Sequence, residues 1–145
     1  MAWAYFDTSA LIKRYVNEAG RREVLQLFRR HDVVTSAVLP VEVRSALRRR
    51  VSEGTLDPAR VPEILRHVTT DRAYWTMVDV GNEVLAAAEA LVGSHPLRTL
   101  DAIHVASAQL FRGRMTVSKV IFVSADVRQT TAAAAVGMTV RRIES

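Results

Sequence analysis

The sequence contains no cysteine. This absence excludes a disulfide scaffold and a thiolate metal site, and it is expected for a protein of the reducing cytoplasm. There is also no apolar run near the roughly 20 residues that cross a membrane, and the first residues lack the basic start and long apolar segment of a signal peptide. We therefore expect a cytoplasmic protein without a membrane segment. Residues 1–145 should form a single domain, with a core drawn from the 49% of hydrophobic residues.

Lysine is scarce, since it occurs only as Lys13 and Lys119. Basic residues nevertheless outnumber acidic ones by 20 to 15, because arginine is abundant. The net charge of +5 favours a polyanionic partner such as nucleic acid, because each phosphate that is neutralised releases counterions. An arginine-rich background composition with a merely solvated surface is the alternative explanation of the same charge.

Short apolar runs alternate with amphipathic or alanine-rich stretches along the chain. The short runs are typical of strands buried in a parallel sheet, and they lie at residues 2–6, 32–35, 75–80, 120–123 and 139–143. The stretches between them predict helices at residues 10–16, 21–30, 37–53, 57–69, 81–92, 100–111 and 127–136. We expect Thr99 to cap the sixth of these helices, Gly113 to end it, and Gly137 to cap the end of the last. The alternation predicts an α/β fold with helices on both faces of a parallel sheet.

Four carboxylates lie at the boundaries of the predicted elements. Asp7 and Asp126 directly follow strands, whereas Glu42 and Asp101 lie in the first turns of helices. For each acid alone, the helix dipole or an Asx-turn is a sufficient explanation. Together they occupy the positions that surround one crevice in an open α/β sheet, where four acids repel each other unless a cation is bound. The four histidines lack zinc spacing, so the all-oxygen donor set predicts Mg²⁺ or Mn²⁺.

Four segments that contain these acids resemble, in order, the motifs of the PIN domain. Within that family, the VapC-type toxins of bacterial toxin–antitoxin pairs are the most similar group. The four segments are residues 7–11, 41–43, 97–104 and 122–126. The resemblance covers essentially the whole chain and implies a three-layer α/β/α sandwich with parallel strands in the order 3-2-1-4-5. Strands one and four are then neighbours, which brings Asp7 and Asp126 together.

The resemblance also implies an activity and partners. It implies a Mg²⁺-dependent endoribonuclease that cleaves single-stranded or structured RNA, acts as a toxin, is held inactive by a cognate antitoxin and forms homodimers. The catalytic and metal-binding roles carry over to Asp7, Glu42, Asp101 and Asp126. Asp7 and Asp101 are the expected direct ligands, Glu42 is a ligand or orients a water molecule, and Asp126 binds directly or through water. Some PIN domains carry a further acid just after the last one, which this sequence lacks.

Each of three polar residues near the acids has either a structural or a functional interpretation. Ser9 and Ser124 lie two residues from Asp7 and Asp126, and they either belong to the polar surroundings of the metal site or cap helices. His104 follows Asp101 by three residues on nearly the same helix face. We expect His104 to be a packed residue that forms one hydrogen bond, in preference to a general acid.

Several arginines near the acids are candidates for RNA contacts. Arg98 precedes the helix of Asp101, and Arg44 and Arg48 follow Glu42 four residues apart on one helix face. Each is either an RNA contact or a solvated side chain, and Arg44 and Arg48 are also candidates for a surface that faces the antitoxin. The helices expected at 21–30 and 58–69 offer apolar residues beside arginine and are the candidate surfaces for a dimer.

Three other functions compete with the toxin. The first is a PIN-fold nuclease of RNA maturation or decay, against which the short chain argues, because processing enzymes often carry further domains. The second is a catalytically silent binding module, which does not require four acids. The third is a phosphotransfer domain of the response-regulator type, which needs paired acids early in the chain and a lysine after a late strand. Lys119 instead precedes its strand.

Overall fold

The computed structural model describes residues 2–116 and 119–145 of the chain. Within these residues, five parallel strands form one sheet in the order β3-β2-β1-β4-β5, which confirms the predicted order. The strands are β1 (Trp3–Phe6), β2 (Asp32–Ser36), β3 (Thr76–Val78), β4 (Val120–Ser124) and β5 (Thr139–Arg142).

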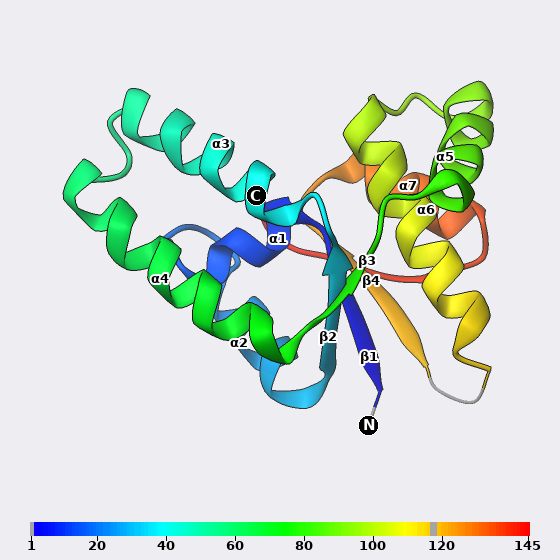
Figure 1. Ribbon diagram of the computed structural model, residues 1–145, viewed down its shortest axis with the longest axis horizontal. Coiled ribbons are helices and arrows are strands. Elements are labelled where there is room, and N and C mark those ends of the chain that lie inside the picture. The colour runs from blue at the N-terminus through cyan, green and yellow to red at the C-terminus, as the bar shows by residue number, and fades with distance from the viewer. Residues whose placement is uncertain (1, 117–118) are drawn as a thin grey trace.

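Helices cover both faces of this sheet, as the α/β/α prediction requires (Figure 1). One face carries α1 (Thr8–Leu11), α2 (Arg21–Arg30), α3 (Leu39–Ser52) and α4 (Val61–Asp71), with the short 3₁₀ turns η1 (Ile12–Arg14), η2 (Pro58–Arg60) and η3 (Arg72–Tyr74). The other face carries α5 (Asn82–Ser94), α6 (Thr99–Arg114) and α7 (Val127–Ala135). None of the helices in the described residues is long and apolar enough to span a membrane.

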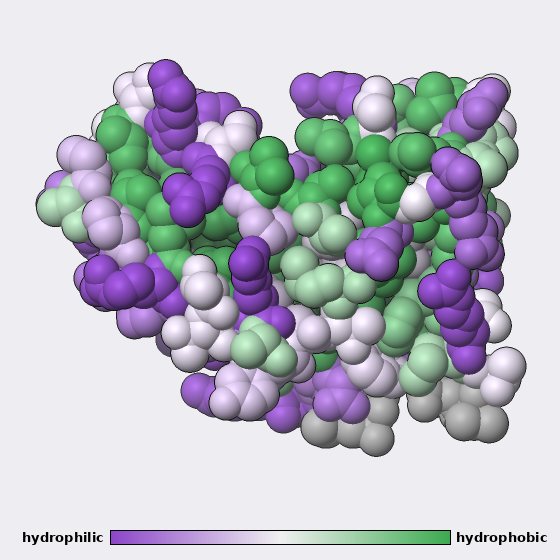
Figure 2. Space-filling view, viewed as in Figure 1, coloured by the Kyte–Doolittle hydropathy of each residue, from purple (hydrophilic) through white to green (hydrophobic). Residues whose placement is uncertain are grey.

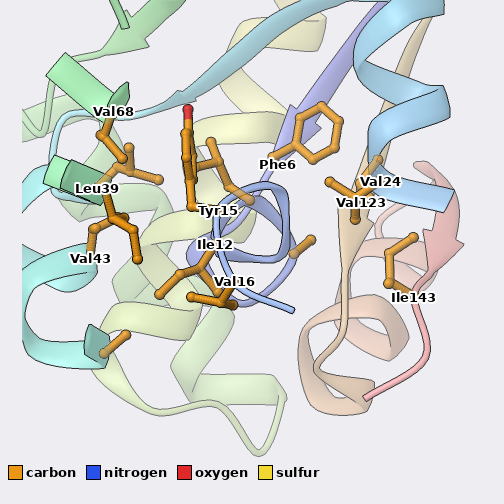
Figure 3. Close-up of a cluster of buried hydrophobic side chains, with 14 of the residues drawn as sticks. Phe6, Ile12, Tyr15, Val16, Val24, Leu39, Val43, Val68, Val123 and Ile143 are labelled. Carbon is orange, nitrogen blue, oxygen red and sulfur yellow. The ribbon is translucent and has the colours of Figure 1, made fainter. Parts of the chain in front are cut away.

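The central strand β1 contributes side chains to two separate cores. Successive residues of a strand point to opposite faces, so Phe6 packs among the residues of α1–α4 and Tyr5 among those of α5–α7. Phe6 lies with Val123 of β4 and Val24 of α2 in the first core (Figure 3). In the second core, the ring of Tyr5 stacks on that of Phe122 with centroids 5.6 Å apart. Burial on both faces fixes the position of β1 and therefore of the acid that follows it.

The ends of α6 differ from the prediction. Arg98, not Thr99, is the N-cap residue, because the Asp101 side chain accepts a hydrogen bond from the Arg98 backbone N–H at 3.2 Å. The helix also continues through Gly113 to Arg114. A glycine inside a helix costs only about 1 kcal/mol relative to alanine, and buried Phe111 anchors the preceding turn. The predicted end signal of the last helix is correct, since Gly137 has a φ of 87° just after α7, and Gly54 has a φ of 78° in the same position after α3.

The exposed large apolar side chains do not lie on the two helices expected to form a dimer surface. Val24 and Leu27 of α2, and Ile64 and Val68 of α4, are buried in the core. Amphipathic helices of this kind turn their apolar stripe inward. The exposed large apolar residues are Val41, Tyr74, Leu85, Val92, Leu100 and Val127. The apolar residues of α2 and α4 therefore pack in the core and do not form an exposed apolar surface.

Candidate active site

The four predicted carboxylates line one cavity of about 360 Å³. Asp7 directly follows β1, Glu42 lies in the first turn of α3, Asp101 in the first turn of α6, and Asp126 is the N-cap of α7. Because β1 and β4 are parallel neighbours, the residues that follow them lie together at the carboxyl end of the sheet. The cavity lining comes from both helical layers, and a notch separates the α3–α4 side from the α5–α6 side in the space-filling view (Figure 2).

Asp7 is the most buried of these acids, with an exposed fraction of 1%. Burial raises the pKa of its carboxyl group, and the opposing effects of His104 and of hydrogen bonds from Ser9 and the Ala10 backbone do not fully offset that rise. The Ser9 hydroxyl lies 2.8 Å from both carboxylate oxygens, and the Ala10 N–H donates to Oδ1 at 3.0 Å. Ionised Asp7 is therefore well oriented but poorly solvated, and a nearby cation would stabilise its charge.

Ser9 and Ser124 connect the two strand ends that carry Asp7 and Asp126. Their hydroxyl oxygens are 3.3 Å apart. The Ser9 hydroxyl also donates to the carboxylate of Asp7. Ser9 also accepts from the Ala125 N–H at 3.0 Å, and Ser124 accepts from the Asp126 N–H at 2.9 Å. The two serines therefore belong to the polar surroundings of the acids and also stabilise the turn before α7.

His104 holds the carboxylate of Glu42. Its Nε2 lies 2.5 Å from Glu42 Oε1, and its Nδ1 lies 2.8 Å from the hydroxyl of Tyr5. The expectation of a buried histidine is correct, with 1% exposed, but the expectation of a single hydrogen bond is wrong because both ring nitrogens are engaged. The Thr8 hydroxyl donates to the same Glu42 oxygen at 2.7 Å. Burial tends to raise the pKa of Glu42, but hydrogen bonding and charge from His104, with smaller effects of Thr8 and Arg49, hold it below its ordinary value.

Asp101 is held from two sides. Its Oδ2 accepts from the Arg98 N–H, and its Oδ1 accepts from the side-chain amide Nε2 of Gln129 at 3.0 Å. The amide of Gln129 is buried, lines the same cavity and comes from the first turn of α7, three residues after Asp126. Gln129 and Thr8 were not predicted as site residues, because neither residue type signals a contact with a carboxylate from a distant segment.

The arginines of α3 that line the acid cavity are not the two expected ones. Arg49 and Arg50 line it, seven and eight residues after Glu42 and therefore on the same helix face. Arg44 and Arg48 follow Glu42 by two and six residues, which places them on the opposite face. Arg44 lines a separate hollow with Pro62, Leu65, Arg66, Thr69 and Thr70 of α4. Arg98 lines a hollow that adjoins the acid cavity.

The oxygen donors around the cavity suit a hydrated divalent cation. In residues 2–116 and 119–145, no three His, Cys, Asp or Glu side chains are grouped to hold an ion directly. Mg²⁺ commonly keeps several water molecules and takes only one or two carboxylates from the protein, so such a group is not required. The Oε1 of Gln129 is also buried without a hydrogen-bond partner in the described part of the chain, although it belongs to a side chain that lines the cavity.

Comparison with known proteins places the chain in a family. Residues 4–134 match the family model described as the PIN domain. The chain is 32% identical over 141 residues to ribonuclease VapC46 of Mycobacterium tuberculosis, and the match covers 97% of each chain. The chain therefore belongs to the PIN-domain family. Within that family, it is a VapC-type protein.

Solved structures from other bacteria share the fold. FitAcB from Neisseria gonorrhoeae matches with a TM-score of 0.66 at 14% identity, over 94% of this chain and 95% of that one. A toxin–antitoxin complex from Klebsiella pneumoniae matches with a TM-score of 0.58 at 22% identity, over 81% of this chain and 83% of that one. These likenesses agree with the strand order and the two helical layers described above.

Proposed function

We propose that the protein is a divalent-metal-dependent endoribonuclease and the toxin of a toxin–antitoxin pair. The observation that carries this proposal is the meeting of four carboxylates from distant segments in one cavity. Nothing in the folding of a sheet requires such a concentration of negative charge, and one of the four is almost fully buried. The 32% identity to a VapC-type ribonuclease over nearly the whole length supports the same reading.

In this proposal the acids have distinct roles. Asp7 and Asp101 would hold the metal ion directly, Glu42 would hold it or orient a water molecule, and Asp126 would hold it directly or through water. When bound, Mg²⁺ or Mn²⁺ would lower the pKa of a coordinated water and stabilise the charge that develops on the scissile phosphate. Residues around the acids keep them in place, as described above for Ser9, which keeps Asp7 oriented through two short contacts. Water is the nucleophile, so no side-chain nucleophile is needed.

The proposed substrate is RNA, either single-stranded or structured. The acid cavity repels phosphates in the absence of metal, so binding must come from cationic groups around it. Arg49, Arg50 and Arg98 line the cavity or the hollow beside it. Arg44 and Arg48 lie on the other face of α3 and are not part of the proposed RNA-binding surface.

The proposed protein partner is a cognate antitoxin that covers the cavity. Val41 and Leu100 line the cavity and are 73% and 44% exposed, so two large apolar side chains face solvent beside the acids. A covering polypeptide would bury them. The Klebsiella pneumoniae neighbour is a toxin–antitoxin complex, which agrees with such a partner. We further propose a single domain over residues 1–145, a homodimer, and a cytoplasmic location.

A nuclease of RNA maturation or decay without a toxin role is the second candidate. It would use the same cavity and chemistry, and it would differ in having no antitoxin. An adjacent gene for a small protein with a DNA-binding N-terminal part would favour the toxin. Growth arrest on expression of the wild-type protein, relieved by co-expression of that neighbour, would distinguish the two.

The activity is tested by expression of the wild type and Asp7→Asn in cells, followed by sequencing of RNA 5′ ends. We expect new 5′ ends at defined sites with the wild type and none with Asp7→Asn. Asp79→Asn is the matched control, because Asp79 is an exposed acid that lines a different hollow. Equal cleavage by purified wild type and Asp7→Asn, after contaminating nucleases are excluded, would refute the assignment.

A further inference from the structure

A second hollow, of about 790 Å³, adjoins the acid cavity and shares Ser9, Arg50 and Asp126 with it. Cationic side chains outnumber carboxylates in this hollow, whereas carboxylates outnumber arginines in the acid cavity. Five cations and two carboxylates line it, and they are Lys13, Arg50, Arg98, Arg128 and Arg142 against Glu18 and Asp126. A strand of phosphates that reached the acids from this side would first meet positive charge.

Two of these cations share one carboxylate within the protein. Lys13 Nζ lies 3.3 Å from Glu18 Oε1, and Arg50 binds both oxygens of Glu18 at 2.9 and 3.0 Å. Arg98, Arg128 and Arg142 form no ion pair among residues 2–116 and 119–145. All three are exposed. The cations of the hollow that no ion pair engages are therefore these three side chains.

Non-local structure brings the three arginines together. In the parallel pairing of β4 with β5, Arg142 lies opposite Ser124. Ser124 precedes Asp126 by two residues in the sequence. Arg128 is in the first turn of α7, and its N–H donates to Asp126 Oδ1 at 2.8 Å. Arg98 is the N-cap of α6, next to Asp101. Arg98 and Arg128 thus belong to elements that also carry residues of the acid cavity, and Arg142 lies beside the strand that leads to Asp126.

We propose that this hollow binds the backbone phosphates of RNA immediately beside the phosphate that is cleaved, with Arg98, Arg128 and Arg142 as the contacts. This inference rests on the proposed ribonuclease function. A guanidinium group offers two parallel donors to phosphate oxygens, and its charge persists at any physiological pH. The arrangement separates the two tasks of the site, because cations hold the strand while the adjacent acids hold the metal ion.

The test is the salt dependence of RNA binding, measured by fluorescence anisotropy with an oligouridylate and with a hairpin RNA in metal-free buffer. The parent is Asp7→Asn, which removes cleavage. At about 0.7 units per phosphate contact on single-stranded RNA, Arg128→Ala/Arg142→Ala should lower the slope of log affinity against log salt by roughly 1.4. Arg44→Ala/Arg48→Ala, the control on the opposite face of α3, should leave the slope unchanged.

The charge-preserving variant Arg128→Lys/Arg142→Lys should keep most of the slope. An unchanged slope in the folded alanine double variant would overturn the proposal and leave an acidic protein segment as the occupant of the hollow. Absence of salt-dependent binding even in the parent would instead count against the ribonuclease function itself.

The contacts of Gln129 support a second, independent inference about the acid cavity. Its Nε2 donates to Asp101, and its Oε1 has no partner in the described residues although the side chain is only 4% exposed. Rotating the amide would place its oxygen against the carboxylate, so the observed orientation is the only one that avoids repulsion. We infer that Gln129 is a positioning residue that orients Asp101 within the cavity.

Calorimetric titration with Mn²⁺ tests this role without any activity assay. Gln129→Leu should weaken Mn²⁺ binding about 10-fold, whereas the Tm of the metal-free protein should stay the same or rise because an unpaired buried oxygen is removed. Gln26→Leu, at an exposed position of α2, is the control. A lower metal-free Tm with unchanged Mn²⁺ affinity would show a merely structural role and refute the inference. No Mn²⁺ binding by the wild type would refute the proposed metal site as a whole.

Discussion

The acid cavity and the basic hollow share Ser9, Arg50 and Asp126, yet they carry opposite charge. The acids of the cavity are placed by topology, because they follow the paired strands β1 and β4 or begin the helices beside them. The free arginines of the hollow come from the starts of α6 and α7 and from the end of β5. One end of a parallel sheet therefore holds an acidic and a basic surface side by side.

The buried ion network at the boundary keeps the two regions distinct. Glu18 binds Arg50 and Lys13 in the hollow, so Arg50 is prevented from pairing with the acids of the cavity. If Arg50 were free, it would neutralise part of the negative charge that a metal ion requires. We expect the loss of one carboxylate to lower the rate of RNA cleavage in the acid cavity and the stability of the fold in the basic hollow.

Loss of an acid from the cavity should have the largest effect. Asp101→Ala should lower the rate of RNA cleavage about 100-fold or more, because in the proposed mechanism charge stabilisation at the scissile phosphate depends on an ion that Asp101 would hold. The fold should survive, since the side chain lines a cavity and is only partly buried. Single-turnover cleavage of a fixed RNA, with Asp79→Ala as the control and circular dichroism to monitor folding, measures this effect. Cleavage within a few-fold of the wild type would show that Asp101 is not a ligand.

Loss of Glu18 from the hollow should affect stability more than chemistry. Glu18→Gln leaves Lys13, whose side chain is 5% exposed, without its carboxylate. Breaking a fully buried pair typically costs 3–5 kcal/mol, but Glu18 is 28% exposed, so we expect a loss of about 2 kcal/mol in the free energy of unfolding. Urea denaturation near pH 7 measures it. A change below about 0.5 kcal/mol would show that solvent already screens the network.

The pH dependence of this loss has a definite sign. Burial tends to raise the pKa of Glu18, but hydrogen bonds and charge from Arg50 and Lys13 outweigh it and hold the pKa below its ordinary value. The stabilisation is therefore present above the pKa of the unfolded chain, near 4.3, and is lost as pH falls through the lower pKa of the folded state. The wild type and Glu18→Gln should converge in stability at acid pH.

The contrast between the regions also shows what sequence reasoning can reach. Alternating strands and helices were sufficient to predict the parallel sheet, and the ends of strands were sufficient to single out Asp7 and Asp126. Arg49 and Arg50 could have been found as well, since they share the helix face of Glu42. Arg142 and Gln129 could not, because their neighbours are set by the register of β5 on β4 and by the docking of α7 on α6. Such non-local placement has no signature in a window of sequence.

The smallest effect we predict, and the sharpest contrast with Glu18, is a gain in stability on replacing Asp7. Its pKa is raised, chiefly by burial, so the ionised carboxylate destabilises the metal-free fold. Asp7→Asn keeps the shape and the hydrogen bond from the Ala10 N–H while removing the charge. We expect a gain of the order of 1 kcal/mol at neutral pH, or about 2–4 °C in Tm for a chain of this length.

The sign of the pH dependence is opposite to that of Glu18. Because the folded-state pKa of Asp7 lies above the unfolded value, the wild type gains stability relative to Asp7→Asn as pH falls through the folded pKa, and the difference disappears below the unfolded pKa. Thermal denaturation of both proteins in metal-free buffer from pH 3 to 8 tests this, and added Mn²⁺ should stabilise the wild type more than the variant. If Asp7→Asn is less stable than the wild type throughout, then the hydrogen bonds from Ser9 and Ala10 outweigh burial, and the cavity does not depend on a cation to relieve its charge.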